Sequence, residues 1–245
     1  MSFAGGKLTN ADYIIDILNH PCFDNLDYIE PFIGYAHILQ RIKNKNSYIA
    51  SDYSEDIVHL HKCIQDTSIN YPDYISREHY NELRKQGIVS SDRSFTSVAW
   101  SYRGKVWGGY GGDFLNGAVP KRHYKYYDKL RQNQVYMSTD ISHRCYTDYL
   151  SVTDKLIYLD PPYVNTIGFS GTGKFDTELF WENTRKLSVN NWVFISEYEF
   201  PDDFISVGSV IKRNNLASSN EPRYEFLCIH NSRINDYIEI VQSHQ

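Results

Sequence analysis

The chain has 245 residues, of which 41% are hydrophobic, so it can form one sizeable domain or a core domain with an insertion. Its formal net charge is −5, so it lacks the overall basic charge of many proteins that bind duplex nucleic acid. Its four cysteines are far apart and form no CxxC pair, which argues against a disulfide framework and a zinc site and indicates an intracellular protein without a metal. The sequence contains neither a signal peptide nor an apolar run of the roughly 20 residues that cross a bilayer, so we expect no membrane association.

The first part of the chain alternates between helix and strand patterns. Apolar residues recur at helical spacing in residues 10–20, 38–42 and 54–65, and short apolar runs at 28–32 and 47–50 are typical of strands. Two strands that are each followed by a loop and a helix form the opening of a doubly wound α/β sheet.

Strand patterns fade after residue 65 and return near residue 155. The intervening residues contain turn signals and short helical pieces. Further strands are predicted at 155–159, 192–195 and 225–229, with a helix at 180–187. We therefore predict an α/β, doubly wound, Rossmann-like domain and a mostly helical insertion. The domain comprises residues 1–65 and 146–245, and the insertion comprises residues 66–145.

The insertion contains a basic stretch within the acidic chain. From Arg103 to Arg131 there are seven basic residues and two acidic ones. Such a stretch contacts nucleic-acid phosphates or forms a solvated helix face, and charge alone leaves both readings open. The neighbouring aromatic residues Tyr102, Trp107 and Tyr110 stack on bases or pack a small core, and we favour packing.

The sequence Asp160-Pro161-Pro162-Tyr163 directly follows the strand predicted at 155–159. Two consecutive prolines allow neither the strand to continue nor a helix to start there. The chain is therefore stiff just beyond the carboxyl end of a strand, where α/β sheets bind ligands. A rigid turn with a capping aspartate is the alternative.

This arrangement suits the methylation of an exocyclic amine. The N6 lone pair of adenine is delocalised into the ring and is a poor nucleophile. A carboxylate and a rigid carbonyl that each accept one N6 hydrogen direct the lone pair outward, and an aromatic ring holds the base. A base in a duplex must leave the stack to reach such a pocket.

Three other elements point to a nucleoside-binding site. Glu30-Pro31-Phe32-Ile33-Gly34-Tyr35-Ala36 follows the first strand, and its small residues let a ligand approach the backbone. Asp52 ends the next strand, where an acid accepts hydrogen bonds from ribose hydroxyls, or else caps the following helix. Phe3-Ala4-Gly5-Gly6-Lys7 precedes the first helix.

In this order, the four elements resemble those of the Dam-type N6-adenine DNA methyltransferases, including their shorter phage and viral members. Phe3 to Lys7 resembles a Trp-Ala-Gly-Gly-Lys element, and Glu30 to Ala36 resembles a Glu-Pro-Phe-x-Gly-x-Gly loop. Ala36 replaces the last glycine of that loop, which is tolerable if its φ angle stays negative. Asp52 matches the ribose-binding aspartate, and Asp160 to Tyr163 matches the catalytic Asp-Pro-Pro-Tyr.

The resemblance implies a Rossmann-like methyltransferase sheet that binds S-adenosylmethionine, an insertion that recognises duplex DNA, and no metal. The catalytic residues would be Asp160, Pro161, Pro162 and Tyr163. The cofactor-binding residues would be Phe3, Lys7, Glu30, Pro31, Phe32, Gly34, Asp52 and Asp160. The DNA-binding residues would be Arg103, Lys105, Lys121 and Arg122.

Several other functions remain open. Methyltransferases that act on cytosine N4 or on glutamine side chains share the proline pair but usually carry Ser or Asn in the place of Asp160. A non-catalytic relic would bind DNA or the cofactor only, but Lys7, Asp52, Asp160 and Tyr163 are all present. Adenine in RNA is a further candidate substrate, and the insertion's resemblance to a DNA-recognition domain argues against it.

Overall fold

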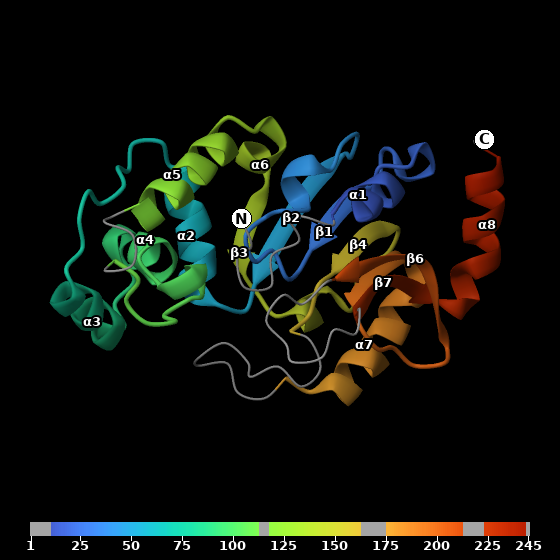
Figure 1. Cartoon of the computed structure of the whole chain (residues 1–245). Coiled ribbons are helices and arrows are strands. Elements are labelled where there is room, and N and C mark those ends of the chain that lie inside the picture. The colour runs from blue at the N-terminus through green and yellow to red at the C-terminus, as the bar shows by residue number, and fades with distance from the viewer. Residues whose placement is uncertain (1–10, 113–117, 163–174, 213–222, 244–245) are drawn as a thin grey trace.

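A computed structural model describes residues 11–112, 118–162, 175–212 and 223–243. Its centre is a seven-stranded sheet of order β3-β2-β1-β4-β5-β7-β6 with helices on both faces (Figure 1). The strands are β1 Asp27–Glu30, β2 Ser47–Asp52, β3 Asp140–His143, β4 Lys155–Leu159, β5 Trp192–Glu197, β6 Phe204–Lys212 and β7 Arg223–His230. The helices are α1 Asp12–Leu18, α2 Glu55–Gln65, α3 Arg77–Gln86, α4 Ser91–Ala99, α5 Ala118–Arg131, α6 Gln134–Ser138, α7 Thr177–Asn190 and α8 Ile234–Gln242.

The sheet reverses its winding direction between β1 and β4. β1 pairs in parallel with both β2 and β4, and the parallel part continues to β3 on one side and to β5 on the other. β7 and β6 complete the sheet as antiparallel strands. In sheets of this kind, ligands bind beyond the carboxyl ends of the strands at the point where the winding reverses.

Asp27 fixes the register of the three strands around this point. It lies opposite Ser47 of β2 and Lys155 of β4 in the two ladders. Its carboxylate accepts hydrogen bonds from the Ser47 hydroxyl and from the Lys155 ammonium group, both at 2.6 Å. The hydrogen bond from Lys155 is the main cause that lowers the pKa of Asp27. This registration aligns the opposite, carboxyl ends of the strands.

Both faces of the sheet are buried, which confirms the doubly wound architecture. Side chains alternate between faces along each strand. Tyr28 and Phe194 belong to the same apolar cluster as residues of α1, whereas Ile29 and Val193 belong to a second cluster with α7. Strands buried on both faces have nearly continuous apolar sequences, as in Lys155–Leu159.

The helix predicted at 38–42 is wrong. A single 3₁₀ turn, Leu39–Arg41, occupies this place, and the backbone is already extended at Ile42. The apolar residues that gave the helical pattern are buried as predicted, but they belong to a loop that turns through positive φ angles at Gly34 and Ala36. The chain returns to the sheet before a second helical turn can form.

Two strands were not predicted, and both lie at sheet edges. β3 has four residues of mixed polarity, Asp140 to His143, and pairs only with β2 within the described chain. β6 contains Gly208 at an irregularity in its pairing with β7, which interrupts its alternation. Short or bulged edge strands carry little of the apolar pattern that reveals a strand in sequence.

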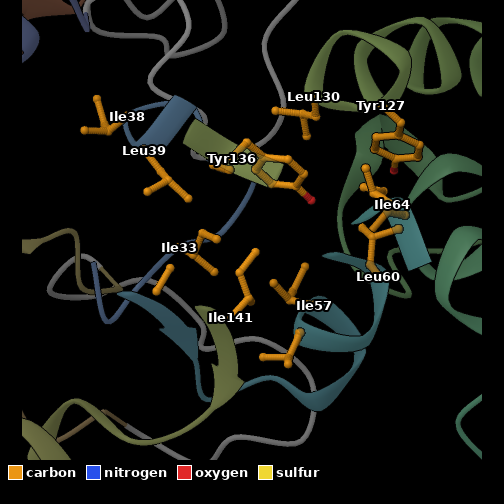
Figure 2. Close-up of a cluster of buried hydrophobic side chains, with 14 of the residues drawn as sticks. Ile33, Ile38, Leu39, Ile57, Leu60, Ile64, Tyr127, Leu130, Tyr136 and Ile141 are labelled. Carbon is orange, nitrogen blue, oxygen red and sulfur yellow. The ribbon is translucent and has the colours of Figure 1, made fainter. Parts of the chain in front are cut away.

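The segment predicted as an insertion contributes α3 to α6 and also β3. Its helices gather at one end of the sheet (Figure 1) and share a core with α2 and the loop after β1. Figure 2 shows Ile57 and Leu60 of α2 in one cluster with Tyr127 of α5 and Tyr136 of α6. The assignment of separate domains stays a prediction. In the described residues, the buried apolar side chains of this segment belong to the same apolar cluster as those of α2.

We expect residues 66–139 to remain unfolded when they are expressed alone, because removing α2 exposes the apolar faces of α4 and α5. Circular dichroism during heating should show no cooperative transition for this fragment, while the full chain should melt cooperatively. A sharp thermal transition of the fragment, with dispersed amide resonances, would contradict the shared core.

Candidate active site

Three carboxyl groups lie at the carboxyl ends of three adjacent strands. Glu30 ends β1, Asp52 ends β2, and Asp160 directly follows β4. Each comes two residues after a fully buried residue of the apolar cluster that contains α1, namely Tyr28, Ala50 and Tyr158. By the alternation of side chains, all three acids therefore lie on the same face of the sheet.

Glu30 is almost completely buried, with 2% of its surface exposed. The Tyr28 hydroxyl donates a hydrogen bond of 2.7 Å to its Oε2 atom. Burial raises the pKa of Glu30 to about 8, against the effect of this hydrogen bond, and the nearby carboxylate of Asp160 raises it further. At neutral pH, the Glu30 carboxyl group is therefore mostly protonated.

Asp52 joins the loops that follow β1 and β2. Its Oδ2 atom accepts a hydrogen bond of 3.1 Å from the amide of Gly34, and its Oδ1 atom accepts one of 2.8 Å from the amide of Ser54. Burial raises the pKa of Asp52 to about 6, and these backbone hydrogen bonds oppose the rise. Ser54, not Asp52, occupies the N-cap of α2, so the interpretation of Asp52 as the helix cap is wrong.

The loop after β1 begins against the sheet and an aromatic cluster. Pro31 is buried. The ring of Phe32 stacks on Tyr146 at 5.6 Å. The amide of Ile33 donates to the carbonyl oxygen of Ser51 at 2.9 Å. These contacts fix the start of the loop above the carboxyl ends of β1 and β2.

Two residues of this loop have left-handed backbone angles. Gly34 has a φ of 47° and Ala36 a φ of 57°. The condition under which alanine is easily tolerated at position 36, a negative φ, is therefore not met. A left-handed conformation costs a residue with a Cβ atom about 1–2 kcal/mol, and the fully buried position of Ala36 offsets this cost through packing.

The Asp160-Pro161-Pro162 segment follows β4 outside any helix, strand or turn, and its two prolines restrict the backbone. Leu159 and Pro161 are buried, whereas Asp160 is half-buried. Tyr13 of α1 lies close to Asp160, and this tyrosine was not predicted from sequence. Its pKa is raised by burial first and then by the Asp160 carboxylate. Only tertiary packing reveals this neighbour, since Tyr13 follows an ordinary helical pattern.

Three predicted site residues, Phe3, Lys7 and Tyr163, lie outside the described residues. The structure brings the remaining predicted catalytic and cofactor-binding residues together at the carboxyl ends of β1, β2 and β4. These residues are Glu30, Pro31, Phe32, Gly34, Asp52, Asp160, Pro161 and Pro162.

All four basic residues predicted to contact DNA are exposed: Arg103, Lys105, Lys121 and Arg122. Arg131, at the end of the basic stretch, instead binds the backbone of the protein. Its guanidinium donates to the carbonyl oxygens of Ile64 and Ile69, at 3.0 and 2.8 Å, and lies 4.6 Å from the centre of the Tyr71 ring. The stretch therefore combines an exposed basic surface with one structural arginine.

The neighbouring aromatic residues divide in the same way. Trp107 and Tyr110 are buried, which confirms packing for these two. The Trp107 indole donates to the Asp56 carboxylate at 2.6 Å, and the Tyr110 hydroxyl donates to the Ile75 carbonyl at 2.7 Å. Tyr102 remains 43% exposed, beside Arg103.

The donor and acceptor groups of the site define the kind of ligand that fits. Carboxyl groups accept hydrogen bonds from ribose hydroxyls and favour positive charge, whereas they repel phosphates. The described residues hold no group of three or more His, Cys, Asp or Glu side chains arranged to bind a metal. The fold and site thus define an α/β protein with carboxyl groups clustered at the carboxyl ends of its parallel strands, where sheets of this kind bind ligands.

Comparison with known proteins identifies the family. Residues 3–151, more than half of the chain, match the model of the D12 class N6 adenine-specific DNA methyltransferases. The chain belongs to this family, which confirms the resemblance to the N6-adenine DNA methyltransferases. The DNA adenine methylases of two strains of Vibrio cholerae serotype O1 are each 21% identical to it over 201 residues, covering 71% of this chain and 70% of the relative.

Solved structures give a weaker likeness. The rRNA methyltransferase aviRa from Streptomyces viridochromogenes has a TM-score of 0.43 and 9% identity, covering 96% of this chain and 90% of its own. A conserved hypothetical protein of Streptococcus pyogenes has a TM-score of 0.41 and 8% identity, covering 89% and 94%. Such scores establish no shared fold, and the fold class rests on the strand order itself.

No helix in the described parts of the chain has the length and apolar character required to span a membrane.

The raised pKa of Glu30 makes the stability of the protein depend on pH. Below the pKa of about 4.5 in the unfolded chain, Glu30 is neutral in both states. Between this value and about 8, the unfolded chain releases the proton and the folded protein keeps it. In this range, the free energy of unfolding therefore falls by about 1.4 kcal/mol for each unit by which the pH rises.

Replacing Glu30 by Gln should therefore stabilise the protein more at pH 8 than at pH 5. Urea denaturation at both pH values measures the difference in unfolding free energy between variant and wild type. Glu239→Gln, at an exposed position of α8, is the control and should change little at either pH. An equal effect of Glu30→Gln at both pH values would refute the raised pKa.

Proposed function

We propose that the segment from Asp160 to Tyr163 catalyses the transfer of a methyl group from S-adenosylmethionine to N6 of an adenine extruded from duplex DNA. One observation carries this proposal. Asp160 and the two restricted prolines directly follow the buried strand β4, and Asp160 lies on the sheet face that also presents Glu30 and Asp52.

S-adenosylmethionine supplies a methyl group activated by a positively charged sulfonium. The acidic character of the site suits such a cofactor, and the Asp52 carboxylate would accept hydrogen bonds from the ribose hydroxyls. The Asp52 oxygens already accept hydrogen bonds from the amides of Gly34 and Ser54, which hold the carboxylate in place. The other cofactor-binding residues would be Phe3, Lys7, Glu30, Pro31, Phe32, Gly34 and Asp160.

The catalytic residues would act on the adenine amino group. The Asp160 carboxylate and the Pro161 carbonyl each accept one N6 hydrogen, which directs the nitrogen lone pair toward the methyl group. Pro161 and Pro162 hold the backbone rigid, so little reorganisation is needed during the reaction. Tyr163 would stack on the base. Transfer would break the bond between the sulfonium and the methyl group, release S-adenosylhomocysteine, and leave N6 to lose one proton to water.

The segment 66–145 would recognise the duplex. Arg103, Lys105, Lys121 and Arg122 are exposed, as phosphate-contacting side chains must be. Such a role requires the protein to work where DNA is present, inside the cell. The proposal requires no metal.

We expect Asp160→Asn to lower the rate of methyl transfer by about 10²–10³-fold, because an amide presents N–H where an acceptor is needed. Asp154→Asn is the matched control, since Asp154 is an exposed residue before the opposite end of the same strand. Its rate should stay near that of the wild type. Single-turnover transfer of labelled methyl groups to a duplex measures both.

Nucleoside analysis of the labelled duplex identifies the substrate atom. Methyl groups on N6 of adenine support the proposal, and methyl groups on cytosine N4 would overturn the substrate while keeping the mechanism. An RNA duplex methylated in preference to DNA would overturn the assigned nucleic acid. Wild-type turnover by Asp160→Asn would overturn the mechanism.

Neutralising Lys121 and Arg122 to Gln should weaken binding to every duplex tested and reduce the salt slope by about 0.9 for each phosphate that the protein no longer neutralises. Fluorescence anisotropy over a series of salt concentrations measures both quantities. The control neutralises two exposed lysines outside this segment, Lys43 and Lys186. An unchanged salt slope would show that Lys121 and Arg122 form only a solvated helix face.

A further inference from the structure

The loop after β1 is held by its carbonyl groups. Three successive carbonyl oxygens accept side-chain hydrogen bonds, two from helices outside the loop and one from Gln40 within it. Gly34 accepts from Nε2 of His61 at 2.8 Å, Tyr35 accepts from the Tyr126 hydroxyl at 2.6 Å, and Ala36 accepts from Nε2 of Gln40 at 3.1 Å. Fixed carbonyls determine where the amide groups and small residues of the loop face.

Two of these hydrogen bonds lead into the segment predicted to recognise DNA. Tyr126 belongs to α5. His61 belongs to α2, and its Nδ1 atom lies 2.8 Å from the hydroxyl of Tyr136 in α6. Burial lowers the pKa of His61 to about 4, so the ring is neutral at pH 7. It can then donate from Nε2 to Gly34 while accepting at Nδ1 from Tyr136.

A third connection starts from the loop itself. The Tyr35 hydroxyl donates a hydrogen bond to the carbonyl oxygen of Gly104. Gly104 is buried, but its two neighbours, Arg103 and Lys105, are exposed basic residues. Tyr35 therefore joins the loop that would hold the cofactor to the backbone between two side chains that would hold DNA phosphates.

The turn around Gly104 is tightly constrained. Arg103 and Gly104 both have positive φ angles, of 55° and 67°. The amide of Tyr102 donates to the Gly109 carbonyl at 2.7 Å, and a β-bridge between Ser101 and Tyr110 closes the base of the turn. A turn of this kind has few alternative conformations, so a displacement of Arg103 or Lys105 would be transmitted to the Gly104 carbonyl.

We propose that Tyr35 is a positioning residue that couples DNA binding to cofactor binding, through its hydroxyl contact with Gly104 and its carbonyl contact with Tyr126. This inference rests on the proposed function of the two surfaces. Phosphates that fix Arg103 and Lys105 also fix the Gly104 carbonyl, which holds the Tyr35 side chain and the loop. Linkage makes the effect reciprocal, so a bound cofactor strengthens DNA binding by the same factor.

The experiment measures this factor directly. The affinity for S-adenosylhomocysteine is determined by calorimetry with and without a saturating concentration of a mixed-sequence DNA duplex, so the measurement does not depend on methylation. The wild type should bind S-adenosylhomocysteine at least about 5-fold more tightly with the duplex, the lower range of measured couplings. Tyr35→Phe removes only the hydroxyl and should reduce this factor to less than about 2-fold.

Two further tyrosine variants separate coupling from general stability. Tyr126→Phe should also lower the coupling, because it frees the Tyr35 carbonyl. Tyr124→Phe is the matched control in the same helix. The Tyr124 hydroxyl donates to the Pro72 carbonyl and accepts from the Trp100 indole, both at 2.9 Å, so its contacts stay within the segment. Tyr124→Phe should keep the wild-type coupling even where it lowers the melting temperature.

The outcomes distinguish this inference from the proposed function. Coupling that is absent in the wild type, retained in Tyr35→Phe, or abolished equally in Tyr124→Phe would overturn the role of Tyr35. Each of these results is compatible with methyl transfer to adenine. Conversely, a wild type that binds both ligands cooperatively but methylates no adenine would overturn the proposed function and leave the coupling in place.

Discussion

Every buried carbonyl group of a loop must find a hydrogen-bond donor, and this constraint links the two parts of the molecule. The loop after β1 contains only one 3₁₀ turn, Leu39–Arg41, and the carbonyls of Gly34 and Tyr35 lie before it. His61 and Tyr126 donate to the carbonyls of Gly34 and Tyr35 instead. Their helices must therefore lie against the loop, and the shared core around α2 follows from that position. The segment from α3 to α6 is thus a structural support of the site as well as a candidate DNA-binding surface.

The burial of carboxyl groups at the end of the sheet lowers the stability of the protein without a ligand. Glu30 is buried beside Asp160, and both effects favour its protonated form. Burial also raises the pKa of Asp52, although hydrogen bonds from the amides of Gly34 and Ser54 stabilise its charged form. Functional sites commonly retain such unfavourable groups, because the ligand supplies the compensating interactions. The fixed register at Asp27, at the other end of the same strands, holds these acids in line.

The distribution of charge explains how an acidic chain can belong to a family of DNA methyltransferases. Acids are concentrated where a positively charged cofactor would bind, and exposed basic residues lie on a separate segment. Net charge alone therefore describes neither surface. Arg131 shows the limit of counting charges, because its guanidinium is used to bind the carbonyls at the end of α2.

The sequence by itself determined the doubly wound fold and the positions of the candidate site residues at the ends of its strands. Strands buried on both faces have continuous apolar runs, and the Asp-Pro-Pro-Tyr and Glu-Pro-Phe motifs are local, so each is legible without the structure. Tertiary structure alone decided the edge strands β3 and β6, the 3₁₀ turn in place of a helix, and the positive φ of Ala36. It also decided the contacts of Tyr35 with Gly104 and Tyr126, which join residues 69 and 91 positions apart. Such contacts leave no local pattern, because a tyrosine that donates to a distant carbonyl has the same sequence signature as one that fills a core.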